Sequence, residues 1–346
     1  MALKCWSRVM LKVASSFVSI KHRFKVFAMS VTQSARVKNL RHEAEGILSV
    51  ELFPANGGTF APFTAGSHID FHLPNGVVRS YSLMNSPGDQ NRYVVGVLND
   101  RNSRGGSRWV HDQLRVGAPL SVSLPRNNFP LNVEAAHSVL VAGGIGITPL
   151  YCMLRQLLAL GKSVELIYCA RSRKEAALLE ALADEDLQVI YHFDEEQGGP
   201  PDLIALLAER PRDAHFYCCG PAPMLTGFEH ACQALDYANV HIERFSAIEQ
   251  AAGTAAADEG YQVVLSKSAL TLEVPAGTVL LDVLLDAGVD VEYSCCEGIC
   301  GACETRVLEG EVAHRDSVLS KGARDSNKVM MICVSGCKGR RLVLDL

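Results

Sequence analysis

The nine residues from Cys295 to Cys303 (CCEGICGAC), near the carboxyl end, constrain this chain more than any other stretch. Read from Cys295, their spacing is C-x4-C-x2-C, and a fourth cysteine, Cys333, follows later. Soft thiolates suit iron–sulfur clusters, and four of them complete two tetrahedral irons. The alternative, a zinc site, usually shows paired C-x2-C knuckles, and only one such pair occurs. The spacing therefore predicts a plant-type [2Fe–2S] cluster.

Composition indicates an ordinary globular protein of two or three domains, with 346 residues, 48% hydrophobic residues and 21% charged residues. The net charge of −5 does not suggest nucleic acid as a partner. The cysteines outside the cluster lie mostly in apolar runs, where a free thiol behaves as a small hydrophobe. With the cluster, this pattern predicts a reducing, cytoplasmic location rather than a disulfide framework.

Residues 1–30 form a basic extension that stands apart from the rest of the chain. Its apolar run is too short and too interrupted to cross a membrane, so no membrane association is expected. The basic, acid-poor composition leaves an organelle transit peptide open. The interpretation we favour is that translation begins at Met29.

Residues 31–132 are rich in short alternating runs, such as 68–73 and 93–97, separated by Gly and Pro turns. Many short strands of this kind predict a small antiparallel barrel. The motif Arg79-Ser80-Tyr81-Ser82 offers a cation that can grip a phosphate, a flat ring and two hydroxyls. Gly105-Gly106-Ser107 opens a predicted helix, whose free N–H groups suit an anion. Taken singly, Arg79 is equally consistent with a surface cation and Tyr81 with a core aromatic.

Strands and helices alternate over residues 133–246, which predicts a doubly wound parallel sheet. The first strand is followed by a glycine-rich turn at 143–149 (GGIGITP), and the fourth by Cys219-Gly220-Pro221. Two such turns at the carboxyl ends of strands predict a nucleotide site, although either turn alone can be structural. Arg171 and Arg173, past the second strand, leave NADH and NADPH both open.

Residues 247–260 lack periodicity and are rich in Ala, Gly, Thr and acidic residues, which indicates a linker. Residues 261–346 contain short strand runs, one helix at 279–286 and the cysteine loop. A short helix against a mixed sheet predicts a β-grasp fold. The expected fold class is thus an antiparallel flavin-type barrel, a doubly wound α/β domain and a carboxyl-terminal ferredoxin-like β-grasp domain.

The three blocks in this order resemble the phthalate dioxygenase reductase family, the reductase components of Rieske oxygenase systems. The resemblance covers about residues 31–346. It rests on RSYSLMNSPGD, VLNDRNSRGGSRWVH, VAGGIGITP, YCARS, CCGP, CEGICGAC, LEGEVAHRDSVLS and RLVLDL. Within the family, the reductases of vanillate O-demethylases are the most similar branch, and those of carnitine monooxygenases are nearly as similar.

The resemblance implies roles for particular residues, and none is a general acid or base. Tyr81, Ser82 and Phe245 would position a flavin. The flavin-binding set would be Arg79, Ser80, Tyr81, Ser82, Gly96, Val97, Leu98, Arg104, Gly105, Gly106, Ser107, Thr148 and Phe245. The nicotinamide nucleotide would lie against Gly143, Gly144, Gly146, Pro149, Cys219, Gly220 and Pro221. The cluster ligands would be Cys295, Cys300, Cys303 and Cys333, and not Cys296, which gives x3 spacing.

The implied chemistry is electron transfer. NADH gives up two electrons as a hydride and the cluster accepts one at a time, so a flavin is expected between them. FMN is preferred to FAD because a single phosphate site suffices and no aromatic platform for an adenine is evident. The resemblance favours NADH over NADPH.

The expected function is transfer of electrons from NADH through FMN and the cluster to a Rieske-type terminal oxygenase. Demethylation of an aromatic acid such as vanillate is the preferred pathway, and the chain is expected to be monomeric. One alternative is a reductase for another hydroxylase, such as a carnitine monooxygenase or a cytochrome P450. The other is an electron carrier without NADH activity.

Overall fold

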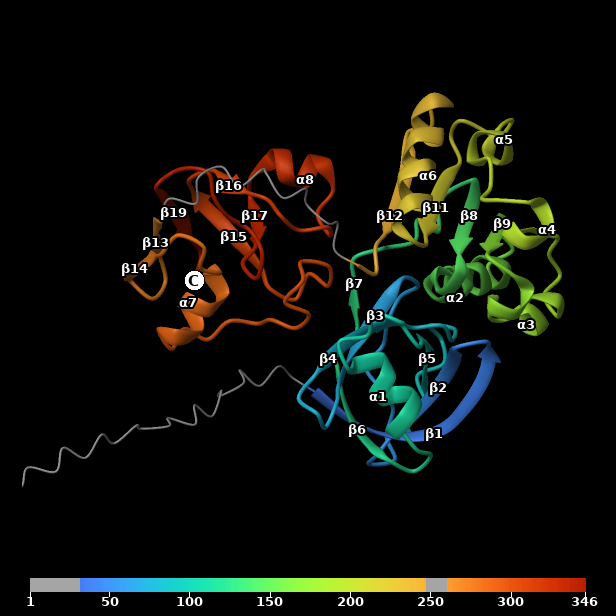
Figure 1. Cartoon of the computed structure of the whole chain (residues 1–346), viewed down its shortest axis with the longest axis horizontal. Coiled ribbons are helices and arrows are strands. Elements are labelled where there is room, and N and C mark those ends of the chain that lie inside the picture. The colour runs from blue at the N-terminus through green and yellow to red at the C-terminus, as the bar shows by residue number, and fades with distance from the viewer. Residues whose placement is uncertain (1–31, 247–259) are drawn as a thin grey trace, which may run out of the picture.

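An antiparallel barrel comes first in the computed structural model, which describes residues 32–246 and 260–346. Its strands run in the order β4-β3-β6-β1-β2-β5, with β7 paired to β3. A bridge between Leu83 and Val95 joins the two edge strands and closes the sheet. Helix α1 (Gly106–Gln113) packs against β4 and β5 (Figure 1). The strands of this barrel unit are β1 Thr32–Ala44, β2 Ile47–Pro54, β3 Ser67–His72, β4 Val78–Ser82, β5 Tyr93–Leu98, β6 Pro119–Ser123 and β7 Arg126–Asn127.

A five-stranded parallel sheet follows, in the order β10-β9-β8-β11-β12. The chain starts in the centre, builds outward to one side and then crosses to the other, so the strand order reverses between β8 and β11. This arrangement confirms the predicted doubly wound sheet. The strands of this parallel-sheet unit are β8 His137–Gly143, β9 Ser163–Ala170, β10 Val189–Phe193, β11 His215–Cys219 and β12 Asn239–Glu243. Its helices are α2 Ile147–Ala159, α3 Leu179–Ala183, α4 Asp194–Gln197, α5 Leu203–Leu207 and α6 Ala222–Ala234, with 3-10 turns at Gly144–Gly146 and Arg173–Glu175.

The carboxyl-terminal unit is a mixed sheet in the order β14-β13-β19-β15-β17, with helix α7 packed against it. The parallel pairing of β13 with β19 and the antiparallel pairing of the others confirm the expected β-grasp fold. The elements are β13 Tyr261–Leu265, β14 Leu270–Val274, α7 Leu280–Asp286, β15 Glu304–Glu309, β16 Val312–Ala313, α8 Lys321–Ser326, β17 Val329–Met331, β18 Gly336–Cys337 and β19 Arg341–Leu344.

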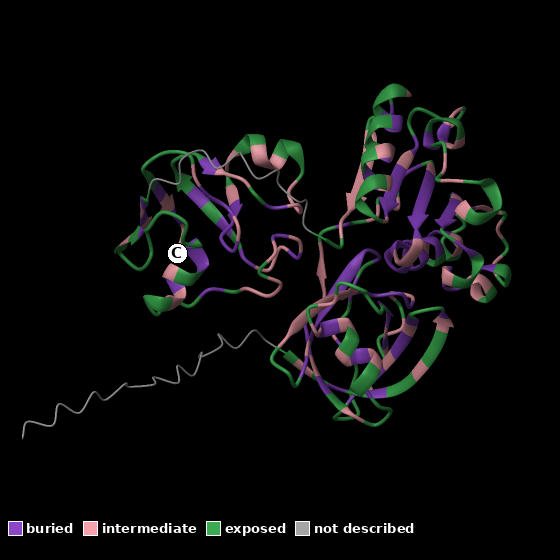
Figure 2. Ribbon diagram, in the orientation of Figure 1, coloured by how far each residue is buried: buried purple, intermediate pink, exposed green. Residues whose placement is uncertain are grey.

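The clusters of buried apolar side chains do not follow the boundaries of the three units. One cluster of buried side chains runs from the barrel, with Val50 and Phe71, into one face of the parallel sheet, with Leu140 and Tyr168. The carboxyl-terminal unit has a separate core around Val263 and Met331. Figure 2 shows buried segments inside each unit and partly exposed loops where the carboxyl-terminal unit faces the barrel. The first two units therefore share apolar packing, whereas the third has an apolar core of its own.

Two elements had no counterpart in the sequence-based expectation. Strand β1 carries register shifts along its length, so its apolar residues do not alternate regularly. Helix α8 has no buried residue, so hydrophobic periodicity could not indicate it; the Ser320 hydroxyl, just before its first residue, accepts a hydrogen bond from the Ala323 N–H. The basic extension and most of the expected linker lie outside the described residues.

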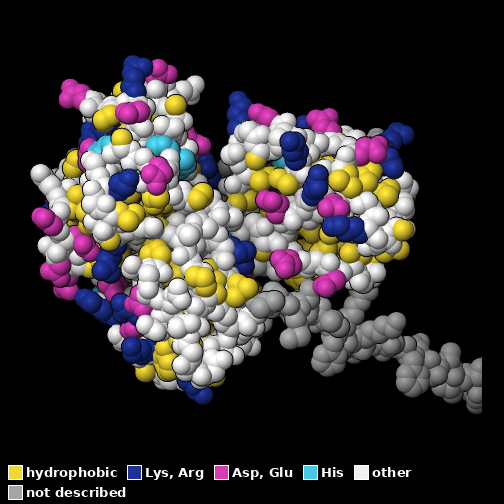
Figure 3. Space-filling view, turned by 180° about the vertical axis from the view of Figure 1, so that it is seen from behind, with side chains coloured by type: hydrophobic (Ala, Val, Ile, Leu, Met, Phe, Trp, Pro, Cys, Tyr) yellow, Lys and Arg dark blue, Asp and Glu magenta, His cyan; other side chains and the backbone are white. Residues whose placement is uncertain are grey.

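Neither described range contains a helix that is long and apolar enough to cross a membrane. Figure 3 shows acidic and basic side chains interspersed over the visible face rather than gathered by sign.

Candidate functional site

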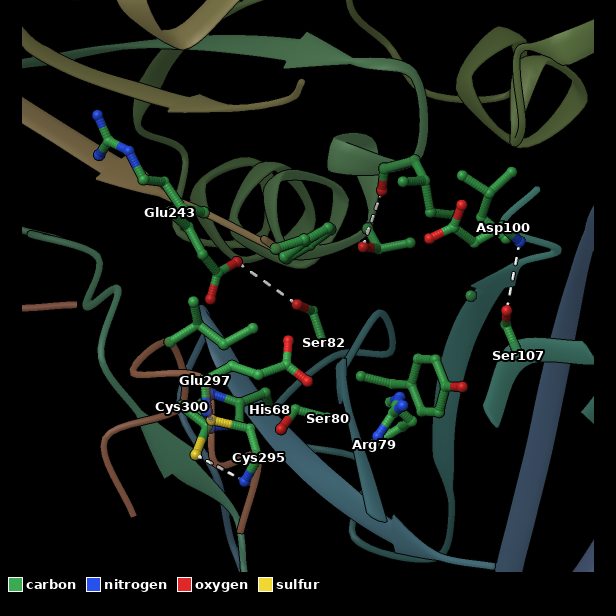
Figure 4. Close-up of a pocket in the computed structure, with 18 of the residues that line it drawn as sticks. His68, Arg79, Ser80, Ser82, Asp100, Ser107, Glu243, Cys295, Glu297 and Cys300 are labelled. Atoms are coloured by element: carbon green, nitrogen blue, oxygen red, sulfur yellow. Dashed lines mark hydrogen bonds between the residues drawn. The ribbon is translucent and has the colours of Figure 1, made fainter. Parts of the chain in front are cut away.

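A cavity opens where the three units meet (Figure 4). Ten of the thirteen predicted flavin residues line it: Arg79, Ser80, Tyr81, Ser82, Gly96, Leu98, Arg104, Ser107, Thr148 and Phe245. The cluster loop adds Cys295, Glu297, Ile299 and Cys300 at one end. The parallel-sheet unit adds Glu243 and Arg244 from the end of β12. Residues that lie far apart in the sequence thus converge on one space.

One end of this cavity is built to receive an anion. Helix α1 starts after Gly105, which has φ 94°, and in its first turn the Arg108 N–H donates to the Ser103 hydroxyl at 3.3 Å, which leaves those of Gly106 and Ser107 without a partner in the described residues. A Cβ at Gly106 would lie 2.5 Å from Cγ of Arg79, so a glycine is needed for the arginine stem to pass over the helix start. A guanidinium and free helix N–H groups therefore meet at one place, which fits a phosphate. Arg104 pairs here with Glu297 of the cluster loop.

Tyr81 brings an aromatic ring and a hydroxyl group to the wall of the cavity. Tyr81 packs edge-on against Phe71 with ring centroids 5.0 Å apart. Burial raises the pKa of Tyr81 to about 12, with Arg79 opposing, and its hydroxyl finds no hydrogen-bond partner within the described residues. A buried hydroxyl without a partner points to a missing polar group. A Cβ at Gly96 would lie 2.6 Å from Cγ2 of Thr148, so these two predicted residues touch across the barrel and the parallel sheet.

Three predicted flavin residues do not line the cavity. The side chain of Val97 is fully buried in the barrel core, because alternate residues of β5 face opposite sides. Gly105 and Gly106 lie at the start of α1, where Gly106 is covered by Arg79. Both glycines lie beside the part of the cavity that fits a phosphate, which agrees with a role in shaping that part.

Glu243 is a site residue to which the sequence assigned no role. It ends β12 and is half-buried, and desolvation raises its pKa to about 8. Its carboxyl group accepts a hydrogen bond from the Ser82 hydroxyl at 3.4 Å (Figure 4). The Cys219 thiol lies 4.0 Å from the same carboxyl group. At neutral pH this carboxyl group is mostly protonated. A single acidic residue in the otherwise apolar and basic run before Phe245 was the signal that could have revealed it.

The two glycine turns meet at the point where the strand order reverses. A Cβ at Gly146 would lie 2.1 Å from the carbonyl oxygen of Cys219, and one at Gly143 would lie 3.1 Å from Cα of Gly220. Pro149 lies in the buried first turn of α2. Gly144 has φ 52° and open space around it. All seven predicted nucleotide residues therefore lie in these two adjacent turns, at the edge where open α/β sheets bind nucleotides.

One of the two arginines that left NADPH open, Arg173, is already engaged. Arg173 makes two hydrogen bonds to Glu196, at 2.6 Å and 3.2 Å, and its guanidinium lies 4.5 Å from the ring centroid of Phe193. A carboxylate beside this arginine would repel a 2′-phosphate. The pair therefore agrees with the preference for NADH.

The four predicted ligand cysteines converge in two pairs. The Cys295 and Cys300 thiols lie within hydrogen-bonding reach of each other, as do those of Cys303 and Cys333. Backbone N–H groups point at the sulfurs, as from Glu297 to Cys295 at 3.4 Å. No three His, Cys, Asp or Glu side chains of residues 32–246 and 260–346 converge as a single-ion site. Two pairs of thiols fit two irons better than one zinc ion.

The two extra cysteines of the carboxyl-terminal unit do not disturb this arrangement. Cys296 is exposed and has φ 56°, a conformation that turns its side chain away from the loop interior. Cys337 is half-buried, and its thiol faces the Arg341 carbonyl oxygen at 3.5 Å. The x4 spacing from Cys295, rather than x3 from Cys296, is therefore consistent with the fold.

Comparison with known proteins identifies two of the units. The family model described as a 2Fe-2S iron-sulfur cluster binding domain matches residues 263–338. The model described as an oxidoreductase NAD-binding domain matches residues 140–230. These matches confirm the expected cluster and nicotinamide cofactor classes and make the chain an oxidoreductase.

Several characterised relatives are similar over almost the whole chain. Phenoxybenzoate dioxygenase subunit beta of Ectopseudomonas oleovorans is 48% identical over 90% of this chain and 97% of its own length. Vanillate O-demethylase oxidoreductase of Pseudomonas sp. (strain HR199) is 42% identical over 90% of this chain and 98% of its own length.

Solved structures extend the comparison to the fold. An intact self-sufficient cytochrome P450 monooxygenase matches with TM-score 0.83 and 39% identity over 91% of this chain, which spans only 41% of that protein. A phthalate dioxygenase reductase, described as a modular structure for electron transfer from pyridine nucleotides to [2Fe–2S], matches with TM-score 0.66 and 36% identity. That match covers 91% of this chain and 98% of the other. The chain belongs to the phthalate dioxygenase reductase family of electron-transferring oxidoreductases.

Proposed function

We propose that the cavity binds FMN and that the chain reduces a Rieske-type terminal oxygenase acting on an aromatic acid. Arg79 and the start of α1 would hold the single phosphate, and Tyr81, Ser82 and Phe245 would hold the ring. The observation that carries this proposal is the convergence in one cavity of the barrel motif, the end of β12 and two cluster cysteines. When bound, NADH supplies a hydride, the flavin accepts it, and the cluster passes on single electrons.

The protein residues position these groups and exclude water. Glu243, neutral at pH 7, orients the Ser82 hydroxyl toward the cavity. Gly143, Gly146 and Gly220 let the β8 and β11 turns pack together, which shapes the crevice proposed for the nicotinamide. We propose domain boundaries at 31–132, 133–246 and 261–346, joined by the 247–260 linker. We also propose that the chain works as a monomer.

The aromatic acid is supported by the names of relatives. The phenoxybenzoate and vanillate systems both act on aromatic rings that bear an acidic group. A cytochrome P450 is the second candidate partner, because a self-sufficient P450 carries a region with this fold. Reconstitution separates the two candidates. Oxygen-dependent turnover of vanillate with NADH and a Rieske oxygenase is expected, and support of a P450 alone would overturn the first choice.

The cofactor assignment is tested on the purified full-length chain. Released flavin is identified by chromatography, iron and acid-labile sulfide are counted, and NADH-dependent reduction of flavin and of cytochrome c is followed separately. The Cys300→Ser variant should keep flavin reduction by NADH and lose cytochrome c reduction. The adjacent Cys296→Ser variant should keep both activities. Loss of flavin reduction in a folded Cys300→Ser protein, or cluster loss in Cys296→Ser, would refute the assignment.

A further inference from the structure

An ion pair of the barrel, with a buried carboxylate and a half-buried guanidinium, faces the cluster loop. Nη2 of Arg126, in β7, lies 2.7 Å from Oδ2 of Asp70, in β3, and Asp70 is only 2% exposed. The Ser80 hydroxyl of β4 donates to the other carboxylate oxygen at 2.6 Å. Burial alone would raise the pKa of Asp70, but Arg126, Ser294 and Ser80 together hold it below its usual range. The pair is therefore charged at neutral pH.

The cluster loop rests on the neighbours of this pair. Nδ2 of Asn128 donates to the Cys300 carbonyl oxygen at 2.8 Å. The imidazole of His68 also bonds to the backbone of Cys300 and lies 3.5 Å from Nη2 of Arg126. A Cβ at Gly301 would lie 2.7 Å from the Asn128 side chain, so loop and barrel are in close contact. Figure 4 shows His68 beside Cys295 and Cys300, with Ser80 next to them.

Both members of the ion pair reach the cluster loop. Nη2 of Arg126 lies 3.5 Å from His68, which lines the cavity together with Cys295 and Cys300. Burial opposes the charge of Arg126, but Asp70 raises the pKa of this arginine, and the Cys300 and Cys295 sulfurs add to the rise. The Asp70 carboxylate is held by Ser80 of β4 and by Ser294, the neighbour of Cys295.

A buried ion pair is weak evidence for a stabilising role. Removing two charges from water costs several kcal/mol per ion, and apolar replacements are often as stable. This pair also lies close to the contact between the barrel and a unit with a separate apolar core. A function at the contact between the barrel and the cluster loop therefore explains the Arg126 charge better than stability does.

We propose that Arg126 is a positioning residue that seats the cluster loop on the barrel and raises the reduction potential of the cluster. In the step concerned, one electron leaves the reduced flavin and enters the oxidised cluster, and no bond is made or broken. The cluster thereby gains one negative charge next to Cys295 and Cys300, and the Arg126 guanidinium stabilises that charge. The inference rests on the proposed function, because it takes these cysteines as ligands.

The test is a redox titration of the full-length protein, with the reduced cluster followed by electron paramagnetic resonance. In Arg126→Gln, the equilibrium constant for electron transfer from flavin to cluster should fall about tenfold, equal to 59 mV for one electron. Arg126→Lys keeps the charge and should restore most of the potential. Arg210→Gln is the matched control, because Arg210 is a similarly buried arginine paired with Glu165, near the start of β9.

The Asp70→Asn variant distinguishes an effect of the Arg126 charge on the cluster from a purely structural support of the cluster loop. It leaves Arg126 uncompensated, so the cluster potential should move in the opposite direction to that of Arg126→Gln. Shifts of the same sign in both variants, or no shift in Arg126→Gln, would overturn the inference. If Arg126→Gln fails to fold, the sign of the Asp70→Asn shift still decides. Absence of a cluster signal in the wild-type protein would instead refute the proposed function.

Discussion

Gly146 offers a prediction in which packing and backbone preference act in opposite directions. It has φ −62° and ψ −8°, a helical conformation that alanine adopts more readily than glycine. An alanine Cβ, however, would lie 2.1 Å from the Cys219 carbonyl oxygen and 2.8 Å from the Gly220 nitrogen. Those atoms are backbone in and beside the central strand β11, so no side-chain rotation relieves the overlap. The two turns must separate by about 1 Å to reach ordinary contact.

The expected cost of Gly146→Ala is about 3 kcal/mol, at the upper end for overpacking, because backbone has to move. Gly144 in the same turn is the matched control. It has φ 52° and open space, so Gly144→Ala meets only backbone strain, about 1 kcal/mol.

Native-state hydrogen exchange of peptides from β8 and β11 measures both costs without assuming that the whole chain unfolds in one step. Exchange should accelerate about 150-fold in Gly146→Ala and about fivefold in Gly144→Ala. The KM for NADH should also rise more in the first variant, since the turns proposed to hold the nucleotide are displaced. Equal exchange in the two variants, or faster exchange in Gly144→Ala, would refute the steric argument.

Three further predictions follow from the site. Burial raises the pKa of Glu243 from its ordinary 4.5 to about 8, so its stabilising contribution is complete below 4.5 and is lost as pH rises through 8. The side chain in Glu243→Gln is neutral at every pH, so this variant should not lose stability in this way. The difference in unfolding free energy should change by at most about 1.4 kcal/mol per pH unit, and melting midpoints from pH 5 to 9 measure it. Glu196→Gln frees Arg173 and should raise kcat/KM for NADPH relative to NADH about fivefold. Gly106→Ala displaces Arg79 and should weaken FMN binding about tenfold, as measured by titrating the apoprotein.

Each of these predictions has a contrary result or a control within the chain. A melting difference between wild type and Glu243→Gln that does not change with pH would show that Glu243 keeps its ordinary pKa. Asp236→Asn breaks a comparably exposed pair with Arg212 and should leave nucleotide preference unchanged. Gly322→Ala adds a methyl group in open space and should leave FMN binding unchanged.

Local patterns in the sequence were enough to predict much of this protein. The spacing of Cys295, Cys300 and Cys303 places three thiols in one short loop whatever surrounds it. Strand–helix alternation determines a parallel sheet, because each apolar strand needs a covering helix. The barrel motif and the glycine turns were likewise recognised from neighbouring residues. In each case the information lies within about one turn or one strand.

Only the tertiary structure decided how these parts act on one another. Asp70 and Arg126 are ordinary charged residues in the sequence, and their pairing beneath the cluster loop depends on strands that meet only in the folded barrel. Glu243 becomes a neutral acid because it is desolvated in the cavity wall, and Arg173 is neutralised by Glu196 from a different strand end. Burial and charge pairing are long-range properties, set by which surfaces leave water together. The sequence by itself therefore determined the cofactor classes, and the folded chain determined the electrostatic surroundings in which they would work.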